Sequence, residues 1–169
     1  DNILDLEISI KERPTGQISL GAGYSTATQG FVQASVAQNN FRGLGQNINL
    51  NLSYSNRQQI YNVGFTEPYL FDSKWTAGAD YYQTVSFFIR SFAYRKHGGD
   101  VRVGHPIFEY TRLFLTYRYE DNKVSNVIND GIDEKVENGS ASSLQASIIR
   151  DKRNNTFEPT DGYYTSSSL

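Results

Sequence analysis

The residues that most often carry chemistry are scarce in this sequence, and their spacing builds no reactive site. The chain of 169 residues has two histidines, His97 and His105, and no cysteine. The histidines stand eight residues apart in or near one strand-like segment, without a further ligand set, so they predict no metal site. The stretch NDGIDE lacks the alternating acidic ligands that a calcium loop places before its glycine. No Ser/His/Asp or Cys/His set stands in a supporting motif, so we expect neither an enzyme nor a cofactor.

The composition narrows the class of protein further. A formal charge of −2 with 20% charged residues gives no polybasic surface, so nucleic acid is not an expected partner. The 12 Tyr, 10 Phe and 14 Gly, against 4 Pro, favour strands and tight turns. The longest apolar runs, such as VSFFI at 85–89, are far shorter than the ~20 residues of a transmembrane helix. An all-β protein is therefore expected.

Alternation of apolar and polar residues marks the strands. In QNINLNLSYS, residues 46–55, every second residue is apolar, and asparagines and serines stand between them. Turn clusters rich in Gly, Asn, Pro and Asp separate such segments, no helical pattern interrupts them, and the polar stretch 122–139 reads as a long exposed loop. The sequence predicts an antiparallel meander with strands near 3–13, 17–24, 30–38, 45–55, 59–67, 73–85, 94–105, 111–121, 140–150 and 162–169.

The alternation alone leaves open which medium the apolar face meets. A soluble barrel would turn that face inward around a core or a ligand. Two features favour an up-and-down transmembrane β-barrel: the opposite face is polar and rich in asparagine, and aromatic residues gather near the strand ends like a membrane-interface girdle. These aromatics are Tyr24, Tyr54, Tyr61, Tyr69, Phe71, Trp75 and Tyr119. The apolar face is therefore predicted to meet lipid, and the polar face a lumen.

Four motifs carry a family resemblance. They are IKERPTGQISLGAGYST, NNFRGLGQ, FTEPYLFD and RDKRNNTFEPTDGYY, in this order. Together they resemble the start of the barrel in BamA-type outer-membrane assembly proteins, a superfamily that also includes TamA and the two-partner secretion transporters. The resemblance covers nearly the whole chain, and four ordered motifs are more specific than any one of them.

The resemblance implies a domain organisation. In this family, periplasmic polypeptide-transport-associated (POTRA) domains precede a barrel of about sixteen strands. Residues 1–13 would be the last strand of a POTRA domain, residues 14–16 a linker, and residues 17–169 the N-terminal half of the barrel. The chain would be a segment of a larger protein of the Gram-negative outer membrane. The connections STATQ, SNRQQ, 86–93 and 122–139 would then face the cell exterior.

The first barrel strand is the candidate functional segment. In this family it pairs only weakly with the last strand and leaves a lateral seam, whose free N–H and C=O groups could template an incoming client strand. Gly21 and Gly23 either weaken the strand for this purpose or relieve crowding where the barrel curves. The candidate edge residues are Gln17, Ile18, Ser19, Leu20, Gly21, Ala22, Gly23 and Tyr24.

The remaining family motifs are predicted to shape turns. Asp161 and Gly162 would turn the chain, Pro159 would fix φ, and the charges near residue 150 would solvate the barrel rim. The turn-motif residues are Asn40, Phe41, Gly43, Gly45, Phe65, Pro68, Tyr69, Arg150, Asp151, Arg153, Pro159 and Gly162.

The resemblance implies an insertase that folds other β-barrel proteins into the outer membrane without a cofactor. Its partners would be membrane lipids, unfolded outer-membrane protein clients and accessory assembly lipoproteins. Three alternatives stay open: a polypeptide-translocating secretion pore of the same superfamily, an unrelated porin-like channel, and a soluble ligand-binding β-barrel.

Overall fold

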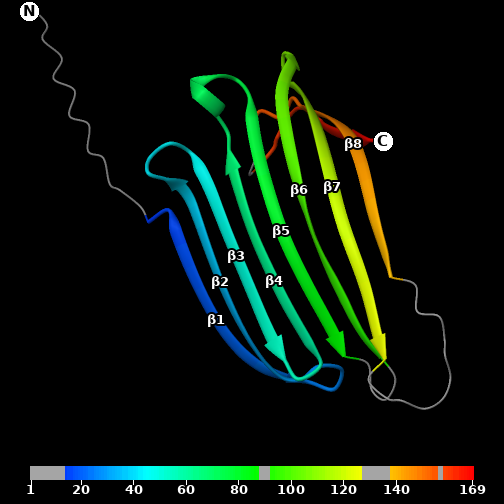
Figure 1. Ribbon diagram of the computed structural model, residues 1–169. Helices are drawn as coiled ribbons and strands as arrows, with labels where there is room; N and C mark the ends of the chain where they lie inside the picture. The colour runs from blue at the N-terminus through cyan, green and yellow to red at the C-terminus, as the bar shows by residue number, and fades with distance from the viewer. Residues whose placement is uncertain (1–13, 88–91, 127–137, 156–157) are drawn as a thin grey trace, which may run out of the picture.

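One antiparallel sheet contains every strand that the structure describes (Figure 1). The computed structural model describes residues 14–87, 92–126, 138–155 and 158–169. The strands pair in chain order, so β1 and β9 are the edges of the described sheet. The predicted all-β meander is thereby confirmed, with strands β1 Gly16–Ser25, β2 Gln29–Phe41, β3 Gln46–Ser55, β4 Gln58–Glu67, β5 Thr76–Phe87, β6 Phe92–Phe108, β7 Thr111–Asn126, β8 Gly139–Asp151 and β9 Tyr164–Ser168.

Several boundaries differ from the prediction. A 3-10 turn of three residues, η1 Leu70–Asp72, stands between β4 and β5, and within the described residues no longer helix interrupts the strands. Gly16, predicted to belong to the linker, is the first residue of β1, because it pairs with Gln38 of β2. The predicted strand 3–13 lies outside the described residues. Within the described residues, no helix is long and apolar enough to cross a membrane.

The predicted loop 122–139 is shorter than expected at both ends. Residues 122–126 continue β7, and Gly139 begins β8. The apolar alternation stops before these residues, but the backbone ladder continues: Lys96 pairs with Asn122, and Tyr94 with Val124. The Tyr94 hydroxyl also donates to Asn122 Oδ1 at 2.9 Å. A ladder whose side chains are solvated by water needs no apolar face, so the apolar alternation alone did not predict the C-terminal end of β7.

The register places the apolar residues of neighbouring strands on one common face. In β3, Leu50 lies between Val36 of β2 and Val63 of β4. Directly opposite residues of an antiparallel pair project to the same side of the sheet. A one-residue slip would turn a whole strand's apolar set to the other side, so this register fixes which side chains share the apolar face.

The apolar residues of the common face form a band, called here the apolar band, whose position along the strand shifts from β1 to β7. It covers residues 18–24 in β1 and residues 113–119 in β7. The centre of the band is Gly21 in β1 and Thr116 in β7. Following the directly paired residues from Gly21 across each neighbouring strand leads to Asn122 in β7, which is six residues beyond Thr116. With about 3.3 Å per residue and about 4.8 Å between strands, this shift over six pairings corresponds to a tilt of about 35°. Membrane β-barrels tilt their strands by a similar angle.

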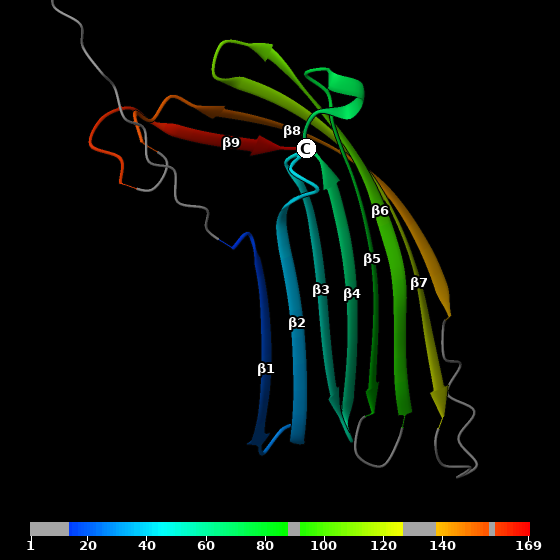
Figure 2. The ribbon, with the colours of Figure 1, turned by 90° about the vertical axis from the view of Figure 1, so that its left-hand side faces the viewer.

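The two faces of the sheet differ in exposure over β6 and β7. Val101 and Tyr117 of the apolar band are 56% and 47% exposed, whereas Asp100 on the polar face is buried. Figure 2 shows that the sheet is bent, with β8 and β9 running in a different direction from β1–β4. Side chains inside a bend approach one another, and those outside it spread apart. The polar face therefore lies on the inside of the bend, and the apolar band on the outside.

Candidate functional site

The edge strand β1 is regular and highly exposed. All ten of its residues pair with β2 without a bulge, from Gly16 opposite Gln38 to Ser25 opposite Gln29. Its other edge has no neighbour in the described sheet. Ile18, Leu20 and Tyr24 project from the apolar face and are among the most exposed large side chains of the described strands. All eight predicted edge residues, 17–24, lie in this strand.

The two glycines in the middle of β1 lie beneath side chains of β2. A Cβ atom on Gly23 would come within 2.7 Å of Phe31 Cζ, and one on Gly21 within 3.0 Å of Gln33 Nε2. Each glycine thus lies close to a specific side chain of β2, which supports the interpretation that the glycines relieve crowding. The weakened-strand interpretation stays a prediction, because the contacts that explain the glycines do not measure how easily the edge opens.

The second and third family motifs meet at one end of the sheet. Gly43 and Gly45 adopt φ of 76° and 75° in the β2–β3 turn, and Asn40 Oδ1 accepts a hydrogen bond of 2.7 Å from the Gly45 N–H. A Cβ on Gly45 would be 3.3 Å from Pro68 Cγ and 3.8 Å from the Tyr69 ring. The motifs NNFRGLGQ and FTEPYLFD therefore build one packed corner. Phe41 ends β2 beneath the Arg42 guanidinium, and Phe65 faces outward from β4 opposite Ile48.

The fourth motif forms the β8–β9 connection, apart from that corner. Arg153 binds the Asp151 carboxylate through two hydrogen bonds of 2.8 and 2.7 Å, and this bonding raises the pKa of the Arg153 guanidinium above its ordinary value. The guanidinium groups of Arg150 and Arg153 lie over the rings of Tyr163 and Tyr164. These contacts agree with a structural role for the turn, in which Pro159 is exposed.

Gly162 is the most constrained position of this turn. Its φ is +97°, and a Cβ there would lie 2.2 Å from the Lys152 carbonyl oxygen. We expect Gly162→Ala to lower the free energy of unfolding by about 1–3 kcal/mol. Gly139→Ala is the matched control, because open space surrounds Gly139, and it should change stability by no more than about 0.5 kcal/mol. Urea unfolding of the full-length parent in lipid vesicles measures both, and equal effects would contradict this account of the turn.

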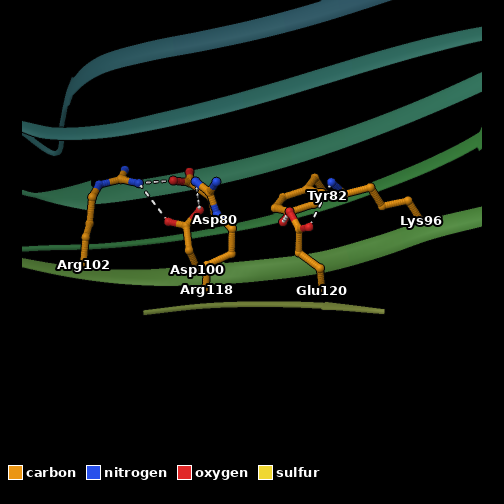
Figure 3. Close-up of polar contacts among 7 residues, drawn as sticks. All are labelled: Asp80, Tyr82, Lys96, Asp100, Arg102, Arg118 and Glu120. Atoms are coloured by element: carbon orange, nitrogen blue, oxygen red, sulfur yellow. Dashed lines mark hydrogen bonds and ion pairs between the residues drawn. The ribbon is translucent and has the colours of Figure 1, made fainter. Parts of the chain in front are cut away.

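A cluster of charged residues crosses the polar face of β4–β7 (Figure 3). Arg102 forms ion pairs with Asp80 and, at 3.4 Å, with Asp100, and its Nη2 donates to Thr66 Oγ1 at 2.8 Å. Asp100, whose side chain is 8% exposed, also binds Arg118 at 3.3 Å. This half of the cluster therefore ties four consecutive strands together.

The other half of the cluster centres on Glu120. Its carboxylate accepts a hydrogen bond from the Tyr82 hydroxyl and forms an ion pair with Lys96 Nζ at 3.0 Å. Gly98, in the row between Tyr82 and Glu120, leaves room for this contact, because a Cβ on it would come within 3.0 Å of the Tyr82 hydroxyl. Three carboxylates and three cations thus neutralise one another across the whole cluster.

The remaining polar face is uncharged over β1–β4. The residues that face inward there are amides, hydroxyls, glycines and a few apolar residues; the polar ones include Gln17, Ser19, Gln33, Ser35, Asn47, Asn49, Asn51, Ser53, Asn62 and Thr66. Ion pairs that join one strand to another across this face are therefore confined to β5–β7 within the described part of the sheet.

The predicted site residues thus occupy three separate places: the β1 edge, the β2–β3 and β4–β5 corner, and the β8–β9 turn. The charged cluster was not predicted as a unit, although Asp80 and Arg118 stand at inward positions of the alternation. Opposite charges at such positions in successive hairpins were the available signal. Across the described ranges, no group of three or more His, Asp or Glu side chains could hold a metal ion.

Comparisons with known proteins agree with this architecture. Residues 40–169 match the Omp85 superfamily domain. The chain is 26% identical over 162 residues to the outer membrane protein assembly factor BamA of Nitratidesulfovibrio vulgaris, covering 94% of this chain and 20% of that protein. It is 28% identical over 165 residues to BamA of Neorickettsia risticii, covering 95% and 22%. The chain therefore spans about a fifth of the length of these relatives.

A solved structure shares the fold. The crystal structure of BamA from Haemophilus ducreyi lacking POTRA domains 1–3 superposes with a TM-score of 0.58 at 22% identity, covering 94% of this chain and 34% of that one. The open nine-stranded sheet is thus part of a bacterial outer-membrane β-barrel, as predicted. The predicted resemblance is confirmed as well, and since the matched domain spans most of its residues, this chain belongs to the Omp85 superfamily.

Proposed function

We propose that the parent protein folds and inserts β-barrel proteins into the outer membrane, and that β1 supplies the edge on which a client strand pairs. Two BamA assembly factors align with nearly the whole chain, which supports assembly as the general activity. The edge role of β1 is our own step beyond that likeness.

The geometry of β1 is the observation that carries this role. Its ten residues form a regular edge without a bulge, and its apolar side chains project, highly exposed, from the outward apolar face. An extended client strand could add to this edge through backbone hydrogen bonds, with its own apolar residues continuing the band. Backbone pairing tolerates many sequences, so one edge can serve clients of different sequence.

The proposed activity needs no reactive side chain, and we propose that the protein is not an enzyme and uses no cofactor. The free energy that drives insertion comes from the client itself, because each unpaired backbone group of the client in hydrocarbon costs several kcal/mol until it finds a partner. Membrane lipids would surround the apolar band. We further propose accessory assembly lipoproteins as partners of the parent.

The proposal also assigns an orientation. The β1–β2 and β3–β4 turns would face the cell exterior, and the corner built by Gly45 and Pro68 would face the periplasm. The long ends of β6 and β7 support this orientation, because β7 spans 16 residues and transmembrane strands need only about 9–11. Bacterial barrels extend their outer side further than their periplasmic side.

Reconstitution of the full-length parent in lipid vesicles tests the activity. An unfolded outer-membrane β-barrel client, diluted from urea, should reach its protease-resistant form faster than in empty vesicles or in vesicles holding an unrelated barrel. The secretion-pore alternative predicts instead that a polypeptide added on one side becomes protected on the other without folding into the bilayer. That second result, with no faster folding, would overturn the proposal.

A further inference from the structure

The side chain of Arg57 bridges two turns that are far apart in sequence. Arg57 lies in the β3–β4 turn, and its Nη1 donates to the carbonyl oxygens of Thr26 at 3.3 Å and Ala27 at 3.0 Å, in the β1–β2 turn. Among the described residues, these are the only side-chain hydrogen bonds that join the turn at 26–28 to an element outside β1 and β2.

The backbone around Arg57 is fixed on its other side. The buried hydroxyl of Ser55, in a residue 3% exposed, accepts hydrogen bonds from the Arg57 and Gln58 N–H groups and donates to the Gln58 carbonyl. The Arg57 carbonyl accepts a 2.8 Å hydrogen bond from the Phe87 N–H at the end of β5. Arg57 is therefore anchored to β3–β5 by its backbone, and it reaches the tip of the β1–β2 hairpin with its side chain.

We propose that Arg57 is a positioning residue that clasps the outer tip of the β1–β2 hairpin and so limits how far the β1 edge can move. This inference rests on the proposed function of β1. The strands behind the clasp are tied together by the charged cluster of β4–β7, whereas the inward face of β1–β4 carries no ion pair in the described structure. The hairpin that bears the edge is thus held to the strands behind it without an ion pair between strands, by its backbone ladder and by the Arg57 contact.

The chemistry of the clasp suits a contact that opens and closes. A guanidinium keeps its charge at every physiological pH and presents its donors in a fixed fork, so two neighbouring carbonyls suit it well. Hydrogen bonds to charged groups are stronger than neutral ones, but here the carbonyls are exposed and water can replace the donor. The clasp therefore favours one position of the tip without locking it.

Distances between spin labels in the full-length parent test the clasp. The segment has no cysteine, so labels can be placed at Thr26→Cys and Asn56→Cys, one in each turn. In Arg57→Ala we expect the population with a displaced tip to rise about tenfold, which corresponds to a loss of about 1.4 kcal/mol. Arg57→Lys, which retains a cationic donor, should restore part of the parent distribution.

Two controls make the measurement specific. Arg95→Ala removes an exposed arginine from β6 and should leave the tip distances unchanged. A label pair at Asn56 and Lys123 should be unaffected by Arg57→Ala, because both sites lie outside the β1–β2 hairpin. Identical tip distributions in the parent and in Arg57→Ala would overturn the clasp.

Client crosslinking to β1 then separates the clasp from the proposed function. A looser tip should expose the edge more often, so the rate of crosslinking to Ser19→Cys should rise in Arg57→Ala. A displaced tip with an unchanged rate would overturn the positioning role while leaving insertion by the parent intact. If the parent itself inserts no client, the proposed function fails, and the tip distances still decide whether Arg57 holds the hairpin.

Discussion

Leu50→Arg should destabilise the folded barrel in a lipid bilayer by about 2–4 kcal/mol, if residue 50 lies near the bilayer midplane. Leu50 is in the middle of β3, between Val36 and Val63 on the outward apolar band. An arginine there must either remain in hydrocarbon or bend toward the interface, and both cost free energy. Urea unfolding of the full-length parent in vesicles measures the effect.

Asn49→Arg is the control for that experiment. Asn49 is the neighbouring residue of the same strand, it is exposed, and it projects to the polar inward face opposite Gly64. An arginine on this side can reach water in the lumen, so the cost should be much smaller. Equal destabilisation at residues 49 and 50 would remove the assignment of the two faces to lumen and lipid.

Leu20→Pro should slow client insertion by the full-length parent about tenfold or more, since each 1.4 kcal/mol is a factor of ten. Proline has no N–H, so β1 loses one ladder donor, and its ring fixes φ near −65°, away from extended β geometry. Leu20 pairs with Ala34 in the middle of β1. The substitution therefore damages the backbone edge that the proposal assigns to the client.

Lys74→Pro tests whether any proline would have the same effect. Lys74 is exposed in the connection between η1 and β5, and the preceding residue, Ser73, is already extended with φ −107° and ψ 178°. Residues before proline favour this geometry, so the substitution should be tolerated. The kinetics of client folding in vesicles compare the two variants, and equal slowing would mean that the edge of β1 has no special part in insertion.

The strands and their faces were accessible from the sequence because both follow a two-residue period and because turn residues punctuate them. QNINLNLSYS is the clearest case: its predicted boundaries, 45–55, and the observed strand, Gln46–Ser55, differ by one residue. The C-terminal end of β7, residues 122–126, was not predicted as strand, for the opposite reason. Residues 122–126 stand beyond the apolar band, where pairing continues without the pattern that reveals it.

Opposite charges at inward positions indicated that a charged cluster could form, but the individual polar contacts could not be assigned, because they depend on register and on turns that meet in space. Asp80, Asp100 and Arg118 form one row only when β5, β6 and β7 are aligned, and a shift of one residue would turn a strand's side chains to the other face. The contact from Arg57 to Ala27 joins two turns separated by a strand pair. No periodic pattern in the sequence predicts such a contact.

Crosslinking of a stalled client to β1 tests the central claim most directly. Single cysteines at Ser19 and Leu20 of the full-length parent, with cysteines along the terminal strand of a client arrested during insertion, should form disulfides in one consistent register. A cysteine at Asn62 is the control, because β4 already has β3 and β5 as neighbours and should capture no client. The account predicts register-specific crosslinks from β1 to the client strand. Crosslinks from β1 only to the parent's own last strand, while client insertion proceeds at its normal rate, would contradict it.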